Sequence, residues 1–191
     1  ISNLSSGRMG YAIAAEAVSR GAQVTLVSGP CSLRDVEGAQ VVRVRTAQQM
    51  LDACRGPFAD ADAAIFVAAV SDWRPERCAD AKMKRDGSDL SVRFIPNPDI
   101  AATLGAEKGS TYSVVFAAET GDPIEAARGK LARKNADLCV ANDVSEPGVG
   151  MGAADNHVWL VDAQGVVEVP TANKRLIARS IVDRMVENGL G

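Results

Sequence analysis

The sequence predicts an α/β fold: a Rossmann-like, mostly parallel sheet with helices on both faces. Two observations carry this prediction. Apolar runs of strand length alternate along the chain with segments of helical period, and polar residues directly follow several of those runs. Because ligands of such sheets bind at the carboxyl ends of the strands, these polar residues are the first candidates for a binding site.

The first half of the chain alternates regularly. In chain order it predicts a helix at 9–20, strands at 22–28 and 41–45, a helix at 46–54 and a strand at 63–69. Gly21 ends the first helix, because glycine readily adopts the left-handed conformation that closes a helix. Thr46 and Gln49 have the spacing of a capping box at the start of the second helix. The last strand is almost continuously apolar, as expected of a central parallel strand.

The second half continues the pattern and then departs from it. It predicts a strand at 90–95, a helix at 99–107, a strand at 112–118, a helix at 122–134, a strand at 138–142, a hairpin of strands 158–161 and 166–169, and a helix at 171–187. Asp122, Pro123 and Glu125 form a strong helix start: a capping carboxylate, a proline at the first helical position and an acid in the first turn. We expect the tail to be a C-terminal hairpin followed by a helix.

Length and composition limit the classes of function. Residues 1–191 fit a single domain, and because a helix follows Ile1 almost at once, we expect an upstream strand or a whole preceding domain to be missing from them. A net charge of −3 disfavours a nucleic-acid surface. No segment has the length of a membrane span or the pattern of a leader, so a cytoplasmic protein with no membrane partner is expected. The four cysteines have no zinc-site spacing and are expected to be inert thiols.

A polar turn opens the chain. Asn3, Ser5, Ser6 and Gly7 precede the first helix, so that hydroxyls, backbone N–H groups and the positive end of the helix dipole meet at one point. Such a point binds anions, phosphate above all. The alternative is structural: Ser5 or Ser6 simply caps the helix, and Asn3 caps its own turn.

Basic residues form two further candidates. Lys130 and Lys134 are four residues apart on one predicted helix and share a face with no evident acidic partner between them. Like charges at this spacing repel, so either solvent screens them or a phosphate lies between them. Lys82 begins a second basic cluster, in a loop that is otherwise an ordinary solvated surface.

Three positions at strand ends or helix starts complete the candidates. Asp72 follows the apolar strand 63–69 and can accept ribose hydroxyls or hold a divalent cation, unless it only forms a turn. The segment Asn97-Pro98-Asp99-Ile100 is either part of a site or a helix cap. Phe116 is either a core residue or a platform on which a base stacks.

Taken together, the motifs resemble those of the phosphopantothenoylcysteine synthetase family. The residues that carry the resemblance are Ile1-Ser2-Asn3, Ser5 to Gly10, Val27 to Pro30, Ala68 to Asp72, Lys82 to Arg85, Asn97 to Ile100, Phe116 to Thr120, Lys130 to Asn135 and Ala141 to Val144. The family's glycine-rich strand and loop before Ile1 are absent from this sequence. The resemblance implies a Rossmann-like, CTP- and Mg²⁺-dependent ligase of coenzyme A synthesis that works as a homodimer with shared sites. In bacteria it is usually fused to an FMN-dependent decarboxylase.

The resemblance also implies roles for individual residues. Asn3 would serve the second half-reaction, and Lys82 would reach from a basic loop into the partner subunit's site. Substrate binding falls to Asn3, Ser5, Ser6 and Gly7, and a metal role to Asp72. The positions implied to bind the nucleotide are Ala68, Ala69, Asp72, Lys82, Asn97, Pro98, Asp99, Ile100, Phe116, Lys130 and Lys134.

Two other functions remain open on the sequence. The first is a nicotinamide-dependent oxidoreductase of the same fold, which requires an acid about 20 residues after the glycine turn to hold ribose. The strand at 22–28 ends without one. The second is a nucleotide-binding domain without catalytic activity.

Overall fold

The computed structural model describes residues 5–79, 81–84, 87, 89–143, 145 and 155–190. Its helices are α1 (Arg8–Ser19), α2 (Ala47–Ala59), α3 (Ile100–Glu107), α4 (Pro123–Lys134) and α5 (Lys174–Glu187). Its strands are β1 (Val24–Ser28), β2 (Ala39–Arg43), β3 (Ala63–Phe66), β4 (Trp73–Pro75), β5 (Phe94–Pro96), β6 (Tyr112–Glu119), β7 (Leu138–Asp143), β8 (Asp155–Asp162) and β9 (Gly165–Asn173). The predicted alternation of strands and helices is confirmed.

The strands form three sheets within the described residues. The largest has the order β3-β6-β7-β8-β9, in which β3, β6 and β7 are parallel and the β8–β9 hairpin is antiparallel. Strands β1 and β2 pair in parallel as a separate two-stranded sheet, and β4 pairs with β5 in antiparallel fashion. The mostly parallel sheet with a C-terminal hairpin is therefore as predicted. Strands β1 and β2, however, form no pairs with the five-stranded sheet in the described part of the chain.

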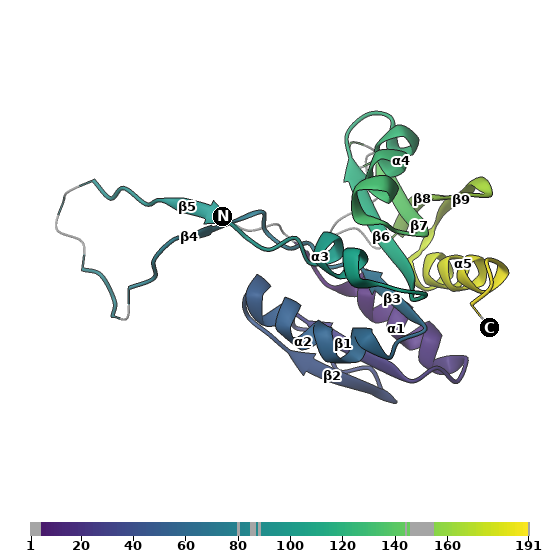
Figure 1. Ribbon diagram of the computed structural model, residues 1–191, viewed down its shortest axis with the longest axis horizontal. Helices are drawn as coiled ribbons and strands as arrows, with labels where there is room; N and C mark the ends of the chain where they lie inside the picture. The colour runs from purple at the N-terminus through teal and green to yellow at the C-terminus, as the bar shows by residue number, and fades with distance from the viewer. Residues whose placement is uncertain are drawn as a thin grey trace.

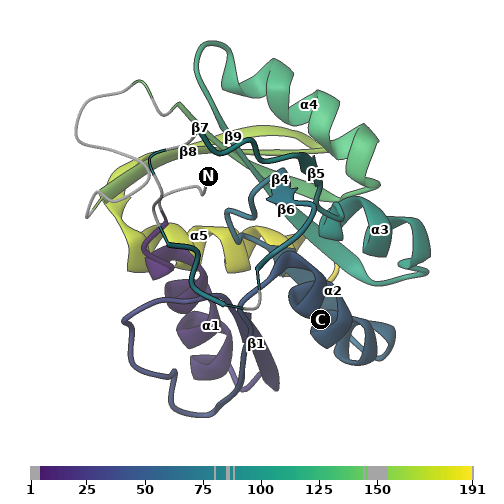
Figure 2. The ribbon, with the colours of Figure 1, turned by 90° about the vertical axis from the view of Figure 1, so that its left-hand side faces the viewer.

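Helices cover both faces of the five-stranded sheet (Figures 1 and 2), with α5 on one face and α4 on the other. Adjacent residues of β6 show the two faces: Val114 packs in the cluster with α1 and α5, and Val115 packs in the cluster with Ala127 of α4. Side chains alternate along a strand, so a sheet covered on both faces needs apolar residues at every position. Strand β7 meets this demand, because its first five residues are all buried.

Capping residues explain where three helices begin. Thr46 and Gln49 form the predicted capping box of α2, in which the Thr46 side chain accepts a hydrogen bond from Gln49 N at 3.1 Å. Asp99 accepts from Ala102 N at the start of α3, and Asp122 accepts from Ile124 N and Glu125 N at the start of α4. Each cap satisfies N–H groups that have no partner inside the helix, a contribution of roughly 1 kcal/mol.

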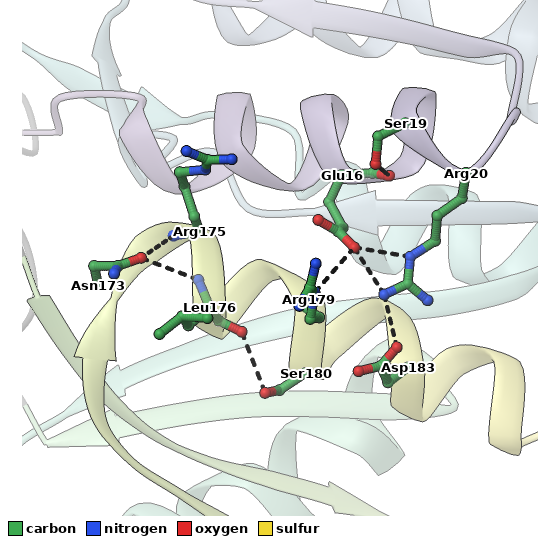
Figure 3. A network of polar contacts seen from close by, with 9 residues as sticks. All are labelled: Glu16, Ser19, Arg20, Asn173, Arg175, Leu176, Arg179, Ser180 and Asp183. Atoms are coloured by element: carbon green, nitrogen blue, oxygen red, sulfur yellow. Dashed lines mark hydrogen bonds and ion pairs between the residues drawn. The ribbon is translucent and has the colours of Figure 1, made fainter.

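An ion-pair network joins the first and last helices (Figure 3). Arg20 donates to Glu16 Oε1 at 2.9 Å and to Asp183 Oδ1 at 2.6 Å, and Arg179 lies 3.7 Å from the same Glu16 oxygen. Glu16 and Arg20 are four apart on α1, and Arg179 and Asp183 are four apart on α5. The two helices therefore run in the same direction along this contact.

A long arm projects from the body of the molecule (Figure 1), with β4 and β5 paired partway along it. The prediction of a strand at 90–95 is wrong in extent: only Phe94–Pro96 is a strand, paired with β4, which was not predicted. An alternating apolar pattern usually indicates a strand with one face packed on the core. Leu90 and Val92 are instead exposed, so this part of the arm does not pack on the core.

The other differences in extent have local causes. The strand expected at 41–45 is β2 at Ala39–Arg43, and the one expected at 63–69 is β3 at Ala63–Phe66. Helix α2 runs past residue 54 to Ala59, with Pro57 in its last turn. Helix α5 begins at Lys174 instead of 171, because β9 continues to Asn173, whose side chain caps the helix. Among the described residues no helix is long and apolar enough to cross a membrane.

Candidate functional site

A large cavity, of about 1620 Å³, is lined by residues of β3 and β6 and by residues that follow the carboxyl end of β3. Nine of the residues predicted to bind a nucleotide line it: Ala68, Asp72, Asn97, Pro98, Asp99, Ile100, Phe116, Lys130 and Lys134. These residues come from four segments that are far apart in the sequence. The structure thus brings most of the predicted nucleotide site into one cavity, whereas Ala69 and Lys82 do not line it.

The two lysines of α4 differ in their surroundings. Lys134 forms an ion pair with Asp99, which contradicts the expectation that these lysines have no acidic partner. Burial raises the pKa of Asp99, but the ammonium of Lys134, the Ala102 N–H and the charge of Lys130 outweigh it and hold the pKa below its usual value. No hydrogen bond or ion pair of the Lys130 ammonium is seen within the described residues. Lys130 is therefore the cation of this cavity that is available to an anion.

Backbone and side-chain contacts hold Asn97 beside the end of β3. Its N–H donates to Asp72 O at 2.8 Å, and its side-chain amide donates to Ser71 O at 2.7 Å. Arg74 in turn donates to Pro96 O at 2.5 Å and to Asn97 Oδ1 at 3.3 Å. Ser71 and Arg74 were not singled out from the sequence, because their contacts depend on the return of the arm to the sheet. These contacts place Asn97 next to Asp72.

Asp72 has the chemistry of a magnesium ligand. Its side chain is exposed and lines the cavity, and no hydrogen bond or ion pair of its carboxylate is seen in the part of the chain that the structure describes. Mg²⁺ usually takes one or two carboxylates together with phosphate oxygens and water. No group of three or more acidic, cysteine or histidine side chains suited to a metal occurs among the described residues. Asp72 therefore fits a cation shared with a phosphate, not an ion held by protein alone.

Phe116 is only partly buried, although it lies on the central strand β6. It packs at the edge of the cluster that includes Val114 and also lines the cavity. Both readings of Phe116 are therefore compatible with its position: one part of the side chain belongs to the core, and another is accessible from the cavity.

The polar turn before α1 is tightly wound. Gly7 is the N-cap of α1 with φ 73°, a left-handed conformation that favours glycine. The Ser5 and Ser6 hydroxyls accept long hydrogen bonds from the N–H groups of Gly7 and Arg8, at 3.4 and 3.5 Å. Neither serine is the N-cap and α1 has no side-chain cap, so the alternative in which Ser5 or Ser6 caps the helix is wrong. Asn3 lies outside the described residues.

A thiol cluster that the sequence did not predict lies beside this turn. Cys31 Sγ is 3.3 Å from the Tyr11 hydroxyl and 3.4 Å from Arg43 Nη1, and a Cβ atom on Gly7 would lie 3.6 Å from Cys31 Cβ. Burial raises the pKa of the Cys31 thiol, but its hydrogen bonds with Tyr11, the Leu33 backbone, Ser28 and Arg43 lower it to about 7. The expectation of four inert thiols is therefore wrong for Cys31.

Lys82 lies on the projecting arm and is exposed. It lies in the chain between β4 and β5, and it is not among the residues that line the cavity of its own subunit. Its predicted role in a partner's site stays a prediction.

Fold and cavity together define an α/β domain of Rossmann-like type, with a large cavity to which residues beyond the carboxyl end of β3 contribute. The chain belongs to the family of the DNA/pantothenate metabolism flavoprotein C-terminal domain, whose model matches residues 1–188. This confirms the resemblance that the motifs indicated, at the level of the family.

Curated relatives carry one recurrent name. The chain is 40% identical over 190 residues to the coenzyme A biosynthesis bifunctional protein CoaBC of Vibrio parahaemolyticus, covering 98% of this chain and 48% of that protein. It is 42% identical over 190 residues to CoaBC of Escherichia coli strain K12, covering 97% and 47%. The chain thus spans about half the length of the curated relatives it matches.

Solved structures agree on the fold. The C-terminal domain of a CoaBC protein superposes with a TM-score of 0.81 at 37% identity, covering 97% of this chain and 86% of that one. A Cab2 variant in complex with phosphopantothenate-cysteine has a TM-score of 0.75 at 17% identity, with 98% and 80% covered. At that identity the second likeness supports the fold only.

Proposed function

We propose that this domain is a phosphopantothenate–cysteine ligase of coenzyme A synthesis that uses CTP. The observation that carries the proposal is that Asp72, Asn97, Phe116 and Lys130, from four separate segments, line one cavity. Membership of the flavoprotein C-terminal domain family, and relatives named for coenzyme A biosynthesis, support the substrate class. By the same argument the natural full-length protein carries a fused decarboxylase that binds FMN.

The proposed chemistry has two steps. The carboxylate of 4'-phosphopantothenate attacks the α-phosphate of CTP, which releases pyrophosphate and leaves an acyl-cytidylate. The amine of cysteine then attacks the acyl carbon, CMP departs, and the amine loses a proton as the amide forms. The enzyme supplies position and charge for both steps, which are the main sources of catalysis in phosphoryl and acyl transfer.

The residues of the cavity have distinct roles in this proposal. Lys130, together with Lys134 once it exchanges Asp99 for phosphate, would offset the triphosphate charge. Phe116, the Ala68-Ala69 backbone and the segment 97–100 would bind the nucleoside. Asp72 would hold Mg²⁺, which when bound neutralises phosphate charge. The turn at Ser5, Ser6 and Gly7 would bind the phosphate of phosphopantothenate, and Asn3 would stabilise the oxyanion when cysteine attacks.

A homodimer with shared sites is part of the proposal. The arm exposes large apolar side chains, with Trp73 51%, Met83 60% and Leu90 66% exposed, and such surfaces usually bind a partner. An arm that enters a second subunit would bring Lys82 to that subunit's cavity. Mixing Lys82→Ala with Asn3→Ala chains should then restore activity, since a hybrid dimer contains one intact site. If the activity of the mixture never exceeds the sum of the activities of the separate variants, Lys82 does not act in a site shared between subunits.

The direct test assays the full-length protein that contains this chain. With CTP, Mg²⁺, 4'-phosphopantothenate and cysteine it should release pyrophosphate and CMP in equal amounts. Pyrophosphate should still be released in a single turnover without cysteine. CTP binding with no pyrophosphate would instead indicate a nucleotide-binding domain without catalysis. Oxidation of NADH by candidate substrates would indicate the oxidoreductase.

A further inference from the structure

The outgoing and returning chains of the arm join the cavity at neighbouring points. The chain passes Asp72 into β4, and it returns through β5 to Asn97 and α3. Strands β4 and β5 pair in antiparallel fashion, with Arg74 opposite Ile95. Asp72 and Asn97 line the cavity, whereas no residue of β4 or β5 does. The contacts made where the strands end therefore decide how Asp72 and Asn97 lie.

Two prolines limit the backbone hydrogen bonds at this junction. Pro96 and Pro98 flank Asn97, and a proline has no N–H group to donate. The Asn97 N–H is thus the single backbone donor of the segment 96–98, and it donates to Asp72 O at 2.8 Å. The other hydrogen bonds that hold this segment to the outgoing chain come from side chains.

Arg74 supplies two of those hydrogen bonds. Its Nη1 donates to Pro96 O at 2.5 Å and to Asn97 Oδ1 at 3.3 Å. The Asn97 side-chain nitrogen donates to Ser71 O at 2.7 Å. A guanidinium can only donate and a carbonyl oxygen can only accept, so the Asn97 amide must turn its oxygen to Arg74 and its nitrogen to Ser71. The flipped orientation would lose both contacts.

The structural alternative is that Arg74 only holds the two strands of the arm together. Those strands have ties of their own farther out: Glu76 N donates to Arg93 O at 2.9 Å, and the two side chains form an ion pair at 3.3 Å. Arg74 instead donates to Pro96 and Asn97, where the chain passes from the arm into the cavity lining. Its contacts thus lie at the junction with the site.

We propose that Arg74 is a positioning residue of the nucleotide site, which acts by fixing the orientation of the Asn97 amide. The inference rests on the proposed function and adds a residue that serves the same site from outside the cavity. The amide N–H that Ser71 O does not use is then the group that Asn97 keeps for an acceptor on the ligand, such as an oxygen of CTP. Without Arg74 the amide is free to turn its oxygen to that acceptor, which repels it.

The test is a double-mutant cycle on the full-length protein, with the affinity for CTP and Mg²⁺ measured by titration calorimetry. Arg74→Met keeps the length of the side chain and removes its donors, and it should weaken CTP binding by about threefold to tenfold, the usual loss for one hydrogen bond. In an Asn97→Ala background the same change should weaken binding by less than about twofold, because the amide that Arg74 orients is gone.

Three further measurements separate positioning from other effects. Arg74→Lys keeps the charge and the donors and should recover part of the affinity. Arg77→Met is the matched control: Arg77 is exposed on the same arm, and its side chain makes no hydrogen bond or ion pair among the described residues. It should leave CTP affinity unchanged. Hydrogen exchange at the Asn97 backbone amide should become about fivefold faster or more in Arg74→Met, since the junction opens more often.

The outcomes decide between the readings. Losses that are coupled in the cycle support the inference, whereas additive losses overturn it, because Arg74 then acts independently of Asn97. Native affinity in Arg74→Met, or an equal loss in Arg77→Met, would also overturn it. If Arg74→Met fails to fold, Arg74→Gln takes its place in the cycle.

The native protein tests the proposed function separately. Release of pyrophosphate by the native protein together with additive losses would leave the proposed function standing and remove the role of Arg74. CTP binding without pyrophosphate release would reject the ligase, and the cycle would still decide the role of Arg74. A native protein that binds no CTP would overturn both.

Discussion

Lys134, in the last turn of α4, forms an ion pair with Asp99, the residue that caps α3. The pair joins two helices that each begin with a capping aspartate and places the second lysine of α4 at the edge of the cavity. It also separates the roles of two lysines that are equivalent in the sequence. A phosphate must compete with Asp99 for Lys134 but not for Lys130.

Lys130→Ala should therefore weaken CTP binding by roughly tenfold to a hundredfold, the usual loss for one charge-assisted phosphate contact. Lys134→Ala should weaken CTP binding less, because a contact between Lys134 and phosphate first requires the loss of its ion pair with Asp99. Titration calorimetry measures both. Arg133→Ala is the matched control, because it removes a positive charge from the same helix outside the cavity. Unchanged CTP affinity in both lysine variants would show that this face of α4 is only a solvated surface.

Gly105→Ala should destabilise the crossing of α3 and α4. A Cβ atom at Gly105 would lie 2.0 Å from the backbone oxygen of Lys134, so one helix must move. Overpacking of this kind typically costs about 1–3 kcal/mol. Gly56→Ala is the control, since Gly56 lies in α2 with nothing within 4 Å of the added atom and should stabilise by roughly 0.5–1 kcal/mol. Urea unfolding measures the free energy of unfolding of both variants. Equal values for Gly105→Ala and Gly56→Ala would contradict the predicted clash.

Asp162 should make the fold sensitive to acid. It accepts hydrogen bonds from Arg184 at 2.7 and 3.0 Å and from Asn188 at 2.9 Å, and its side chain is 1% exposed. Burial raises the pKa of Asp162, but Arg184 and Asn188 outweigh it and lower the pKa below the usual value. As the pH falls, the Asp162 carboxylate is therefore protonated in the unfolded chain before it is protonated in the native protein. The stabilisation is complete above about pH 4 and is lost as the pH falls through the native pKa.

Asp162→Asn should accordingly lower the free energy of unfolding at pH 7 by about 3 kcal/mol or more, because Arg184 loses its buried partner. The variant should also show a shallower loss of stability between pH 4 and pH 2 than the native chain. Thermal unfolding over this range measures both effects. Parallel curves for the two proteins would show that other carboxylates dominate the acid response.

Cys31 should react faster than Cys54 with iodoacetamide at neutral pH. The Cys31 thiol has a pKa of about 7, whereas burial raises the pKa of Cys54. Only the thiolate is nucleophilic, so alkylation of Cys31 should reach half its maximal rate near pH 7. Tyr11→Phe removes a hydrogen bond to the thiolate and should move this midpoint upward. Peptide mass spectrometry follows each cysteine, and an unchanged midpoint would exclude Tyr11 as a cause.

Asn3→Asp should separate the two half-reactions. If Asn3 acts only on the oxyanion formed when cysteine attacks, the variant still releases pyrophosphate and accumulates phosphopantothenoyl-CMP. Loss of one such donor usually costs about a hundred- to a thousandfold in rate. Quenching the variant with CTP and phosphopantothenate, followed by mass analysis, detects the intermediate. Equal slowing of both steps would mean that Asn3 only shapes the turn before α1.

Local signals predicted the helices and strands best. The caps at Thr46 and Asp122 act within one helical turn, so the sequence shows them directly. The Asp99–Lys134 pair and the Cys31 cluster join residues far apart in the chain, and no spacing rule reveals such contacts. Strand β4 was missed for a related reason: it pairs across the long arm and buries little, so it has no hydrophobic period. Asp72, Phe116 and Lys130 were candidates from strand ends and charge spacing, but only the resemblance to a family assigned them to one nucleotide site.

The network between α1 and α5 bears on how the protein is made. Glu16 lies in α1 and Arg20 at its C-cap, and their partners Arg179 and Asp183 lie in α5; Arg20 and Asp183 are 163 residues apart in the chain. At the usual rates of synthesis the early helix waits on the order of ten seconds for these contacts. During that interval its apolar stripe has no α5 to cover it. Nascent chains of this protein are therefore expected to depend on chaperones until α5 has been synthesised.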